Sequence, residues 1–400
     1  MRYLIAGNGP AAVSAVREIR ALDPDGEILM VSPENNEPYS RITVPELMVG
    51  EVEERDIYFV PGFYEQYRVD ARLGCRLTLL RPDDHCAWLS NGEKVQYDRL
   101  LLATGAHPLR PEWAEEGITG IFTLWNRSDA LNIAGQLKPG ETAVIAGAGL
   151  VAFQAARALN AYGIKVTLCA RRYIMSRQLD TEAAARLKAA AESCGVRVLL
   201  HTSVEQVLTS EHAVAAVRLS NGEEIRTHCL LACMGTQPNL EMLDGILDWN
   251  GGVEADDTMK TALTDVYAAG DIVRARMQGG TEKSVRAIWP NAVEQGRVAG
   301  RNMAGAYTLF EGSRAMNSIE LFGVSFISAG QVEAKKGQQT LLLRNTPEAY
   351  QKLIMENGVL KGLTFAGQVQ QAGILAAKLG MNIAGYLGKL PDLDLEMLRV

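Results

Sequence analysis

The sequence predicts an α/β protein with two tandem Rossmann-like domains followed by a C-terminal α+β domain. Three observations carry this prediction. An apolar strand, a glycine turn and an amphipathic helix open the chain, the same series returns from residue 142, and short alternating strands follow residue 315. A series that repeats along a chain indicates a duplicated unit. The predicted domains are residues 1–110 together with 236–315, residues 111–235, and residues 316–400.

The first unit opens with an apolar strand at residues 2–6, and Gly7 to Ala12 leads without a gap into a helical pattern that reaches Leu22. In this interpretation Gly7 permits the sharp turn and Gly9 lets the backbone approach a pyrophosphate, while Ala12 lets helix and strand pack closely. The N–H groups and the positive dipole end of the helix suit phosphate oxygens. The pattern therefore predicts a phosphate-binding turn.

A carboxylate at the end of the next strand is expected to accept hydrogen bonds from ribose hydroxyls. The strand is predicted at Glu27 to Val31, and Glu34 is the nearest acid. An ordinary solvated loop residue is the alternative for Glu34. A later buried strand ends in the small residues Ala103-Thr104-Gly105, which suggests that the backbone there approaches something bulky.

The second unit repeats the first. Its glycine turn, Gly147 to Ala152, starts 140 residues after Gly7. The hairpin sequence Leu89-Ser90-Asn91-Gly92-Glu93 recurs unchanged 130 residues later, from Leu219 to Glu223. Turn, hairpin and closing strand keep the same order in both copies. Two dinucleotide-binding domains are therefore predicted.

The rest of the chain alternates between strand and helix signals. A strand at Asp265 to Ala269 ends at Gly270-Asp271, and a helix at 292–303 is opened by Trp289-Pro290-Asn291. The C-terminal domain has strands at 339–344, 351–356 and 359–365, an Asn357-Gly358 hairpin turn, a helix at 373–387 and an acidic, loosely held tail. It shows no chemistry of its own, so we expect an interface role.

Composition excludes several classes of protein. The net charge of −7 and the lack of a Lys/Arg-rich run argue against a nucleic-acid surface. No apolar stretch reaches transmembrane length, and the first strand begins at residue 2, so a cytoplasmic protein is expected. The six cysteines match neither a zinc nor an iron–sulfur spacing, and buried free thiols are the expected state. We therefore expect no iron–sulfur centre held by this chain.

Several motifs together resemble the FAD-dependent pyridine nucleotide-disulfide oxidoreductase superfamily. They are Gly7-x-Gly9-Pro10-Ala11, Ala103-Thr104-Gly105, Gly147-x-Gly149, Gly235 with Pro238-Asn239, and Tyr267-Ala268-Ala269-Gly270-Asp271. Within it, Pro38-Tyr39-Ser40-Arg41 and the segment from Trp289 to Arg297 are similar to the branch of rubredoxin and ferredoxin reductases and the flavin part of assimilatory nitrite reductases.

The resemblance implies an FAD-binding domain at 1–110 with 236–315, an NAD(P)-binding domain at 111–235 and an interface domain at 316–400. It places the FAD pyrophosphate at the first turn, Glu34 near the ribose, and Asp271 at the ribitol or phosphate; a helix N-cap is the alternative for Asp271. The implied FAD residues are Gly7, Gly9, Pro10, Ala11, Glu34, Arg41, Ala103, Thr104, Gly105, Gly270 and Asp271. Arg41, Trp289 and Pro290 would lie by the isoalloxazine, with core packing as the alternative for Trp289.

The sequence departs from the family near the flavin. The segment from Tyr39 to Pro45 has no cysteine where disulfide-reducing relatives carry one, so thiol–disulfide chemistry at the flavin is not expected. Glu46 stands about where many relatives place a lysine near the flavin N5. No residue is assigned to acid–base catalysis, because the predicted reaction needs little of it. Positioning and flavin electronics supply most of the catalysis.

The implied NAD(P) site is altered too. Its residues are Gly147, Gly149, Leu150, Val151, Arg171, Arg172 and Gly235. Ala152 replaces a third glycine, Gln154 stands where relatives have a glutamate, and Ala170 with the two arginines replaces the acid that would suit NADH. This pattern favours NADPH slightly over NADH. A solvated arginine pair and a weakened nicotinamide site are the alternatives.

The predicted function is an FAD-dependent NAD(P)H oxidoreductase that exchanges electrons with an iron–sulfur partner: a ferredoxin, a rubredoxin or a subunit of a larger redox enzyme. The larger complex is favoured modestly because residues 316–400 have no other visible task, and a homo- or hetero-oligomer could form through them. Two alternatives stay open, a stand-alone NAD(P)H oxidase or diaphorase and an FAD-holding subunit with a decayed nicotinamide site.

Overall fold

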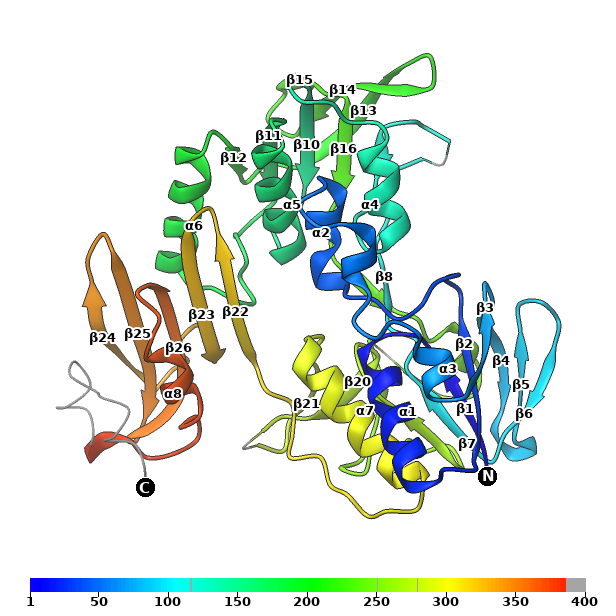
Figure 1. Cartoon of the computed structure of the whole chain (residues 1–400). Helices are drawn as coiled ribbons and strands as arrows, with labels where there is room; N and C mark the ends of the chain where they lie inside the picture. Colours follow the sequence, from blue (N-terminus) through cyan, green and yellow to red (C-terminus); the bar gives the residue numbers. More distant parts are fainter. Residues whose placement is uncertain (116, 250, 279, 386–400) are drawn as a thin grey trace. The chain divides into compact units, whose positions relative to one another are not determined.

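A computed structural model describes residues 1–115, 117–249, 251–278 and 280–385. The chain forms two compact units, each built from several segments (Figure 1). Unit 1 comprises residues 1–40, 54–107 and 236–314, and unit 2 comprises residues 41–53, 108–235 and 315–400.

Unit 1 is built on a parallel sheet of five strands in the order β19-β7-β1-β2-β3. Residues 3–6 of β1 are all buried, as expected for a strand covered on both faces. The elements of the sheet and its helices are β1 (Arg2–Ala6), α1 (Pro10–Leu22), β2 (Glu27–Ser32), α3 (Phe63–Gln66), β3 (Val69–Leu73), β7 (Arg99–Leu102), β19 (Val266–Ala268) and α7 (Trp289–Met303).

Helices α1 and α7 lie side by side at very short range (Figure 1). A Cβ atom on Gly296 would lie 2.1 Å from the carbonyl oxygen of Ala11, and one on Gly300 would lie 2.4 Å from that of Ala15. Only glycine fits at such distances. The spacing of the two glycines therefore lets α7 approach the helix that follows the first turn.

Two smaller sheets and a strand pair complete unit 1. They are β4 (Leu77–Arg81) with β5 (Cys86–Leu89) and β6 (Lys94–Gln96), β18 (Val253–Glu254) with β20 (Val273–Arg276) and β21 (Lys283–Val285), and β8 (Ala106–Pro108) with β17 (Thr236–Pro238). The predicted hairpin at Asn91-Gly92 is present, and Gly92 has a φ of +86°. That angle is typical of the last residue in a three-residue hairpin loop.

Unit 2 contains a second parallel sheet, β12-β11-β10-β16-β9, whose central strands follow the same order as those of unit 1. The predicted α/β fold with two Rossmann-like sheets is thus confirmed. The elements are β9 (Ile121–Phe122), α4 (Arg127–Ala134), β10 (Thr142–Ala146), α5 (Leu150–Ala161), β11 (Lys165–Ala170), α6 (Thr181–Ser193), β12 (Arg197–Leu200), β13 (Val204–Ser210), β14 (Ala213–Leu219), β15 (Glu224–Arg226) and β16 (Cys229–Ala232).

The segment 41–53 belongs to unit 2, although the predicted domain 1–110 did not separate it. It forms α2 (Val44–Met48), which packs against α4 and α5. Val44, Leu47 and Met48 are buried there. Apolar packing, which sequence order does not reveal, therefore decides where this segment lies.

The C-terminal part of unit 2 is an antiparallel sheet in the order β22-β23-β26-β25-β24. Its elements are β22 (Met316–Leu321), β23 (Val324–Gly330), β24 (Gln339–Asn345), β25 (Ala349–Glu356), β26 (Val359–Gly367) and α8 (Ala372–Ala376). The three predicted strands are present within two residues of their expected bounds, and both residues of the predicted hairpin turn, Asn357 and Gly358, have positive φ.

The predicted helix at 373–387 is wrong beyond Ala376 within the described residues. Helix α8 ends at Ala376, and Leu360 of β26 donates its N–H to the Met381 carbonyl at 3.0 Å. That bond draws the chain back to the sheet. Residues 386 and 387 and the predicted loose tail lie outside the described residues.

Candidate functional site

The implied FAD residues of unit 1 gather at one edge of its parallel sheet. Gly7 follows β1, Glu34 follows β2, Ala103 to Gly105 follow β7, and Gly270-Asp271 follow β19. Because the carboxyl ends of parallel strands meet at one edge, these residues lie at the place where open α/β sheets bind ligands. Pro10 and Ala11 open α1 at the same edge.

Gly7 and Gly9 have different structural reasons to be glycine. Gly7 has a φ of +133°, and a Cβ there would lie 2.0 Å from the Ala103 carbonyl oxygen, so a side chain is excluded by the protein itself. Gly9 has an ordinary φ of −90°, and a Cβ there would meet no atom within 4 Å. The space beside Gly9 is therefore open to a ligand, as a pyrophosphate site requires.

The start of α1 offers hydrogen-bond donors to that space. Gly9 is its N-cap residue and has no side chain to cap the helix, and Pro10 lacks an N–H. The first N–H groups of a helix have no partner within it, so those after Pro10 are available to phosphate oxygens. The donor set and the open space both fit the pyrophosphate of a dinucleotide.

Glu34 does not stand alone. The Tyr39 hydroxyl donates a hydrogen bond of 2.6 Å to Glu34 Oε2. Tyr39 is 5% exposed, so this contact fixes the carboxylate at the end of β2. The ribose role of Glu34 stays a prediction. Tyr39 appeared in the sequence only as part of a family motif, and its hydroxyl contact had no sequence signal.

The backbone after β7 is locked by Asn239. Asn239 Nδ2 donates to the Thr104 carbonyl at 2.8 Å, and Thr104 Oγ1 donates to the Asn239 carbonyl at 2.6 Å. A ring nitrogen of His107, Nδ1, lies 2.6 Å from Asn239 Oδ1. Asn239 therefore holds the Ala103 to Gly105 segment in place, a positioning role that the sequence did not reveal.

Gly270 and Asp271 occupy the turn between β19 and β20. The alternative of a helix N-cap for Asp271 is wrong, because α7 begins at Trp289 and its N-cap is Ile288. Gly270 has a φ of +86°, and its N–H donates to Oε1 of the buried Gln295 at 2.8 Å. Gln295 thus positions this turn from α7, and no sequence signal showed it.

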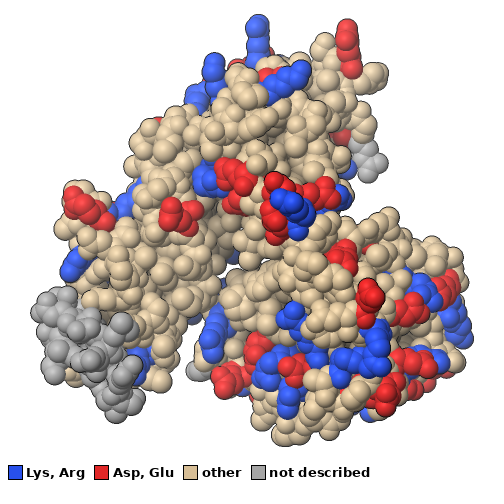
Figure 2. Space-filling view, in the orientation of Figure 1, with Lys and Arg blue, Asp and Glu red and all other residues tan. Residues whose placement is uncertain are grey.

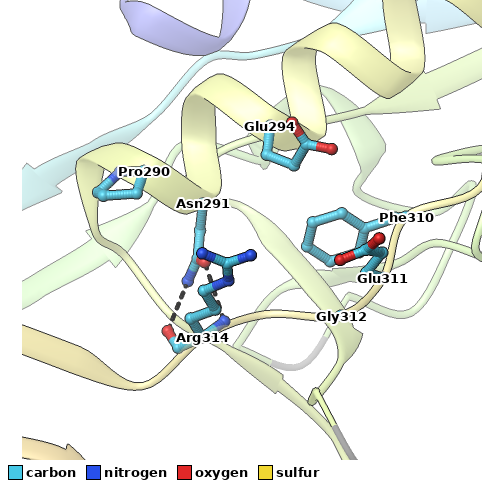
Figure 3. A pocket seen from close by; sticks show the side chains of 7 residues that line it. All are labelled: Pro290, Asn291, Glu294, Phe310, Glu311, Gly312 and Arg314. Atoms are coloured by element: carbon cyan, nitrogen blue, oxygen red, sulfur yellow. Dashed lines mark hydrogen bonds between the residues drawn. The ribbon is translucent and has the colours of Figure 1, made fainter. Parts of the chain in front are cut away.

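Trp289 and Pro290 form the first turn of α7. The Trp289 ring lies 5.1 Å from that of Phe59 in an edge-to-face arrangement, so core packing accounts for part of its environment. Pro290 lines a cavity of about 200 Å³, shown in Figure 3. This volume is below the roughly 300–1,000 Å³ of ordinary ligand pockets.

That cavity has a structural explanation. Asn291 Nδ2 donates to the Arg314 carbonyl at 3.0 Å, and the Arg314 N–H donates back to Asn291 Oδ1 at 3.0 Å (Figure 3). The pair fastens the chain that leaves unit 1 to the start of α7. Glu294, Phe310, Glu311 and Gly312 form the remaining wall.

Arg41 and Glu46 belong to unit 2. Arg41 Nη1 donates to the Trp125 carbonyl at 3.2 Å, and its guanidinium carbon lies 6.0 Å from the centre of the Trp125 ring. Burial raises the pKa of the nearby Asp129 carboxyl, and the charge of Arg41 acts against that shift. The flavin-adjacent roles of Arg41, Trp289 and Pro290 stay predictions.

Glu46 forms an ion pair across α2 and α5. Its Oε1 accepts from Arg157 Nη2 at 2.9 Å, and Arg157 also binds Glu51 at 3.0 Å. The other oxygen of Glu46, Oε2, is buried without a hydrogen-bond partner among the described residues. An acid on α2 therefore pairs with an arginine on α5, a contact that the sequence did not reveal.

The second turn reproduces the first in atomic detail. Gly147 has a φ of +134°, and a Cβ there would lie 2.0 Å from the Cys233 carbonyl oxygen. Gly149 has a φ of −84°, and a Cβ there would meet no atom within 4 Å. Leu150 and Val151 begin α5, which also lacks a side-chain cap. The second turn thus has the same open space and the same free helix terminus.

The other implied NAD(P) residues share this edge. Arg171 and Arg172 follow β11 and are exposed, while Gly235, with a φ of +105°, follows β16. Ala152 is fully buried in α5, where it packs as a small residue. The structure therefore brings the implied NAD(P) residues together, and the second turn keeps the geometry of the first despite Ala152.

The cysteines differ in exposure. Cys194 is exposed, whereas Cys169 and Cys229 are buried, and none is disulfide-bonded. Burial raises the pKa of the Cys169 thiol to about 11 and also raises that of Cys229. Since the thiolate is the reactive form, buried thiols stay unreactive near neutral pH.

We expect a thiol-specific disulfide reagent at pH 8 to modify Cys194 first and to leave Cys169 and Cys229 protected until the chain unfolds. Cys194→Ser should remove the fast phase. Because the folded pKa values lie above the unfolded one, the associated stability is present below pH 9 and is lost as the pH rises toward the folded values. Rapid modification of Cys169 in the native protein would contradict this assignment.

On the face drawn in Figure 2, acidic and basic side chains lie interspersed, and no continuous basic area is visible. Among the described helices, none combines the length and apolar character that crossing a membrane requires. The described residues also contain no group of three or more His, Cys, Asp or Glu suited to a metal ion.

Comparisons with known proteins agree with this geometry. The sequence pattern of the family described as pyridine nucleotide-disulphide oxidoreductase matches residues 1–296. Subunit epsilon of the NADH-dependent phenylglyoxylate dehydrogenase of Aromatoleum evansii is 31% identical over 386 residues, covering 94% of this chain and 90% of that subunit. The NADH-rubredoxin oxidoreductase of Clostridium acetobutylicum is 27% identical over 352 residues, covering 87% of this chain and 86% of that enzyme.

A solved structure shows the same fold. In the covalent complex of putidaredoxin reductase with putidaredoxin, the matched chain has a TM-score of 0.88 at 20% identity, and the match covers 100% of this chain and 97% of that one.

Proposed function

Because the chain belongs to the pyridine nucleotide-disulphide oxidoreductase family, we propose that it passes electrons from NAD(P)H through FAD to an iron–sulfur protein. The predicted enzyme class, an FAD-dependent NAD(P)H oxidoreductase, and the predicted cofactors are confirmed. FAD suits this task because it accepts a hydride and releases single electrons.

One observation carries the proposal. Two glycine turns with the same backbone angles each leave an open space at their second glycine and a helix terminus without a cap. A chain that binds one dinucleotide needs one such turn. Two of them supply one site for FAD in unit 1 and one for the nicotinamide nucleotide in unit 2.

The chain's own residues position these groups. Backbone N–H groups at the start of α1 and α5 would hold phosphates, and Glu34, fixed by Tyr39, would accept hydrogen bonds from a ribose. Asn239 and Gln295 hold the Ala103 to Gly105 segment and the Gly270 turn. These contacts would orient the cofactor rather than transfer protons.

The acceptor is proposed from two further observations. The segment from Tyr39 to Pro45 carries no thiol that could take electrons from the flavin. The relatives include a rubredoxin reductase and a subunit of a larger dehydrogenase. We propose that the acceptor is an iron–sulfur subunit or carrier and that the C-terminal domain forms the contact with it. A cytoplasmic location and the oligomeric state stay predictions from the sequence.

Anaerobic stopped-flow absorbance tests the proposal. We expect NADPH or NADH to bleach the flavin at a rate in the range of about 1–1,000 per second, as in ordinary enzymes. Oxidised ferredoxin or rubredoxin should then restore the flavin spectrum faster than oxygen does. Bleaching by neither nucleotide would indicate the decayed nicotinamide site, and equally fast reoxidation by oxygen would indicate the stand-alone oxidase.

A further inference from the structure

We propose that the second dinucleotide site selects NADPH over NADH through Arg171 and Arg172. The proposal rests on the proposed function and names the nucleotide that this site takes. It runs against the names of both relatives above, which specify NADH.

The internal duplication gives the first argument. In unit 1, Ala6 pairs with Val31, and in unit 2 the equivalent Ala146 pairs with Cys169. Counting three residues onward from each pair aligns Glu34 with Arg172. The same position thus carries a carboxylate where the fold meets the FAD ribose, which has free hydroxyls, and a guanidinium where it meets the second nucleotide.

A carboxylate and a guanidinium at this position suit different ligands. A carboxylate accepts hydrogen bonds from a ribose diol and repels a 2′-phosphate, whereas a guanidinium offers paired donors to phosphate oxygens. Ala170, the last residue of β11, also brings no acid to the site. The exchange of charge between the two copies therefore indicates a phosphate on the second ribose.

The two arginines are not used by the protein itself. Both are exposed, and neither forms a hydrogen bond, an ion pair or a ring contact with the described part of the chain. By contrast, Arg197 in β12 and Arg218 in β14 of the same unit are paired with glutamates. Unpaired guanidinium groups at the end of β11 are therefore available to a ligand.

The loop that carries the arginines is fastened beside the phosphate turn. Met175 donates its N–H to the Ala148 carbonyl at 2.8 Å, and its side chain is buried together with that of Ile174. Between residues 171 and 180 the one acid is Asp180, whose charge is engaged by Lys352. The loop thus presents its positive charge next to the second glycine turn.

Calorimetric titration of the FAD-loaded protein tests this assignment without turnover. We expect adenosine 2′,5′-bisphosphate to bind about 100-fold more tightly than adenosine 5′-monophosphate, since two charge-assisted contacts are each worth about tenfold or more. Arg171→Gln and Arg172→Gln should each weaken binding of the bisphosphate by about tenfold and leave the affinity for the monophosphate unchanged. Arg172→Glu, which copies Glu34, should abolish the preference.

Arg226→Gln is the matched control. Arg226 is an exposed arginine of the same unit, and its carbonyl accepts from Thr142 Oγ1, which places it at the amino end of β10, away from the turn. An equal affinity for the two nucleotides would overturn the proposal. So would a loss of bisphosphate affinity in Arg226→Gln as large as that in Arg171→Gln or Arg172→Gln. If neither nucleotide binds the flavin-loaded protein, the proposed function fails with it.

Discussion

Gly7→Ala is expected to destabilise the protein by about 2–5 kcal/mol, whereas Gly9→Ala should leave the apoprotein nearly as stable as before. The physical difference is local. At Gly7 a methyl group would lie 2.0 Å from the Ala103 carbonyl oxygen, and the φ of +133° is closed to side chains. At Gly9 the same methyl group meets no atom within 4 Å.

For FAD affinity we expect the reverse: Gly9→Ala is the variant that loses affinity although it keeps its stability. The Gly9 methyl group enters the space left for the pyrophosphate, so we expect FAD to bind about 10- to 100-fold more weakly to a folded chain. Urea unfolding of the apoprotein and FAD titration by fluorescence quenching measure the two effects. If Gly9→Ala retains FAD as tightly as the parent, the pyrophosphate does not lie at this turn.

Gly149→Ala serves as a control on specificity. It makes the same change at the second turn, where a Cβ also meets open space. We expect it to weaken binding of the nicotinamide nucleotide and to leave FAD bound. An effect of Gly149→Ala on FAD would mean that the two turns do not serve separate ligands.

The sequence could predict these turns because their chemistry is local. A strand, two glycines and a helix occupy consecutive positions, and the backbone angle at Gly7 depends on neighbours that are close in sequence. A distant contact, the one with Ala103, was signalled by small residues at the end of a buried strand. Repetition at Gly147 then turned a weak signal into a specific one.

The contacts that hold the site in place could not be predicted in the same way. Asn239 is 135 residues from Thr104, and Gln295 is 25 residues from Gly270. A single polar residue in a loop or helix has no periodicity that marks its partner. Likewise, the segment 41–53 follows a strand of unit 1 in sequence, yet it packs on α4 and α5 and pairs with Arg157, contacts that place it in unit 2.

A buried ion pair shows the same limit and leads to the second large effect. Lys352 was part of a strand predicted from its apolar neighbours, yet its side chain is only 8% exposed and contacts Asp180, which is 1% exposed. Lys352 Nζ also donates to the Val332 carbonyl at 2.8 Å. The pair joins β25 of the C-terminal sheet to the N-cap of α6.

The Asp180 carboxylate accepts two further hydrogen bonds. Its Oδ1 accepts from the Ala183 N–H at 2.9 Å, and its Oδ2 accepts from the Tyr350 hydroxyl at 2.7 Å. Burial is the main cause that raises the pKa of Tyr350, and the bond to Asp180 adds to it, so the hydroxyl remains a donor. The Asp180 carboxylate therefore accepts hydrogen bonds from the Ala183 N–H and the Tyr350 hydroxyl, and Lys352 balances its charge.

We expect Lys352→Met to cost about 3–5 kcal/mol, because it leaves a buried carboxylate without its cation. The double variant Lys352→Met with Asp180→Asn should recover most of that loss, since asparagine can still cap α6 and no charge remains buried. Hydrogen exchange in β25 and α6, read beside urea unfolding, measures the effect where it arises. Because Asp180 also ends the loop that carries Arg171 and Arg172, the single variant should weaken adenosine 2′,5′-bisphosphate as well. A single variant as stable as the parent, or a double variant no better than the single, would show that the pair does not hold the C-terminal sheet to α6.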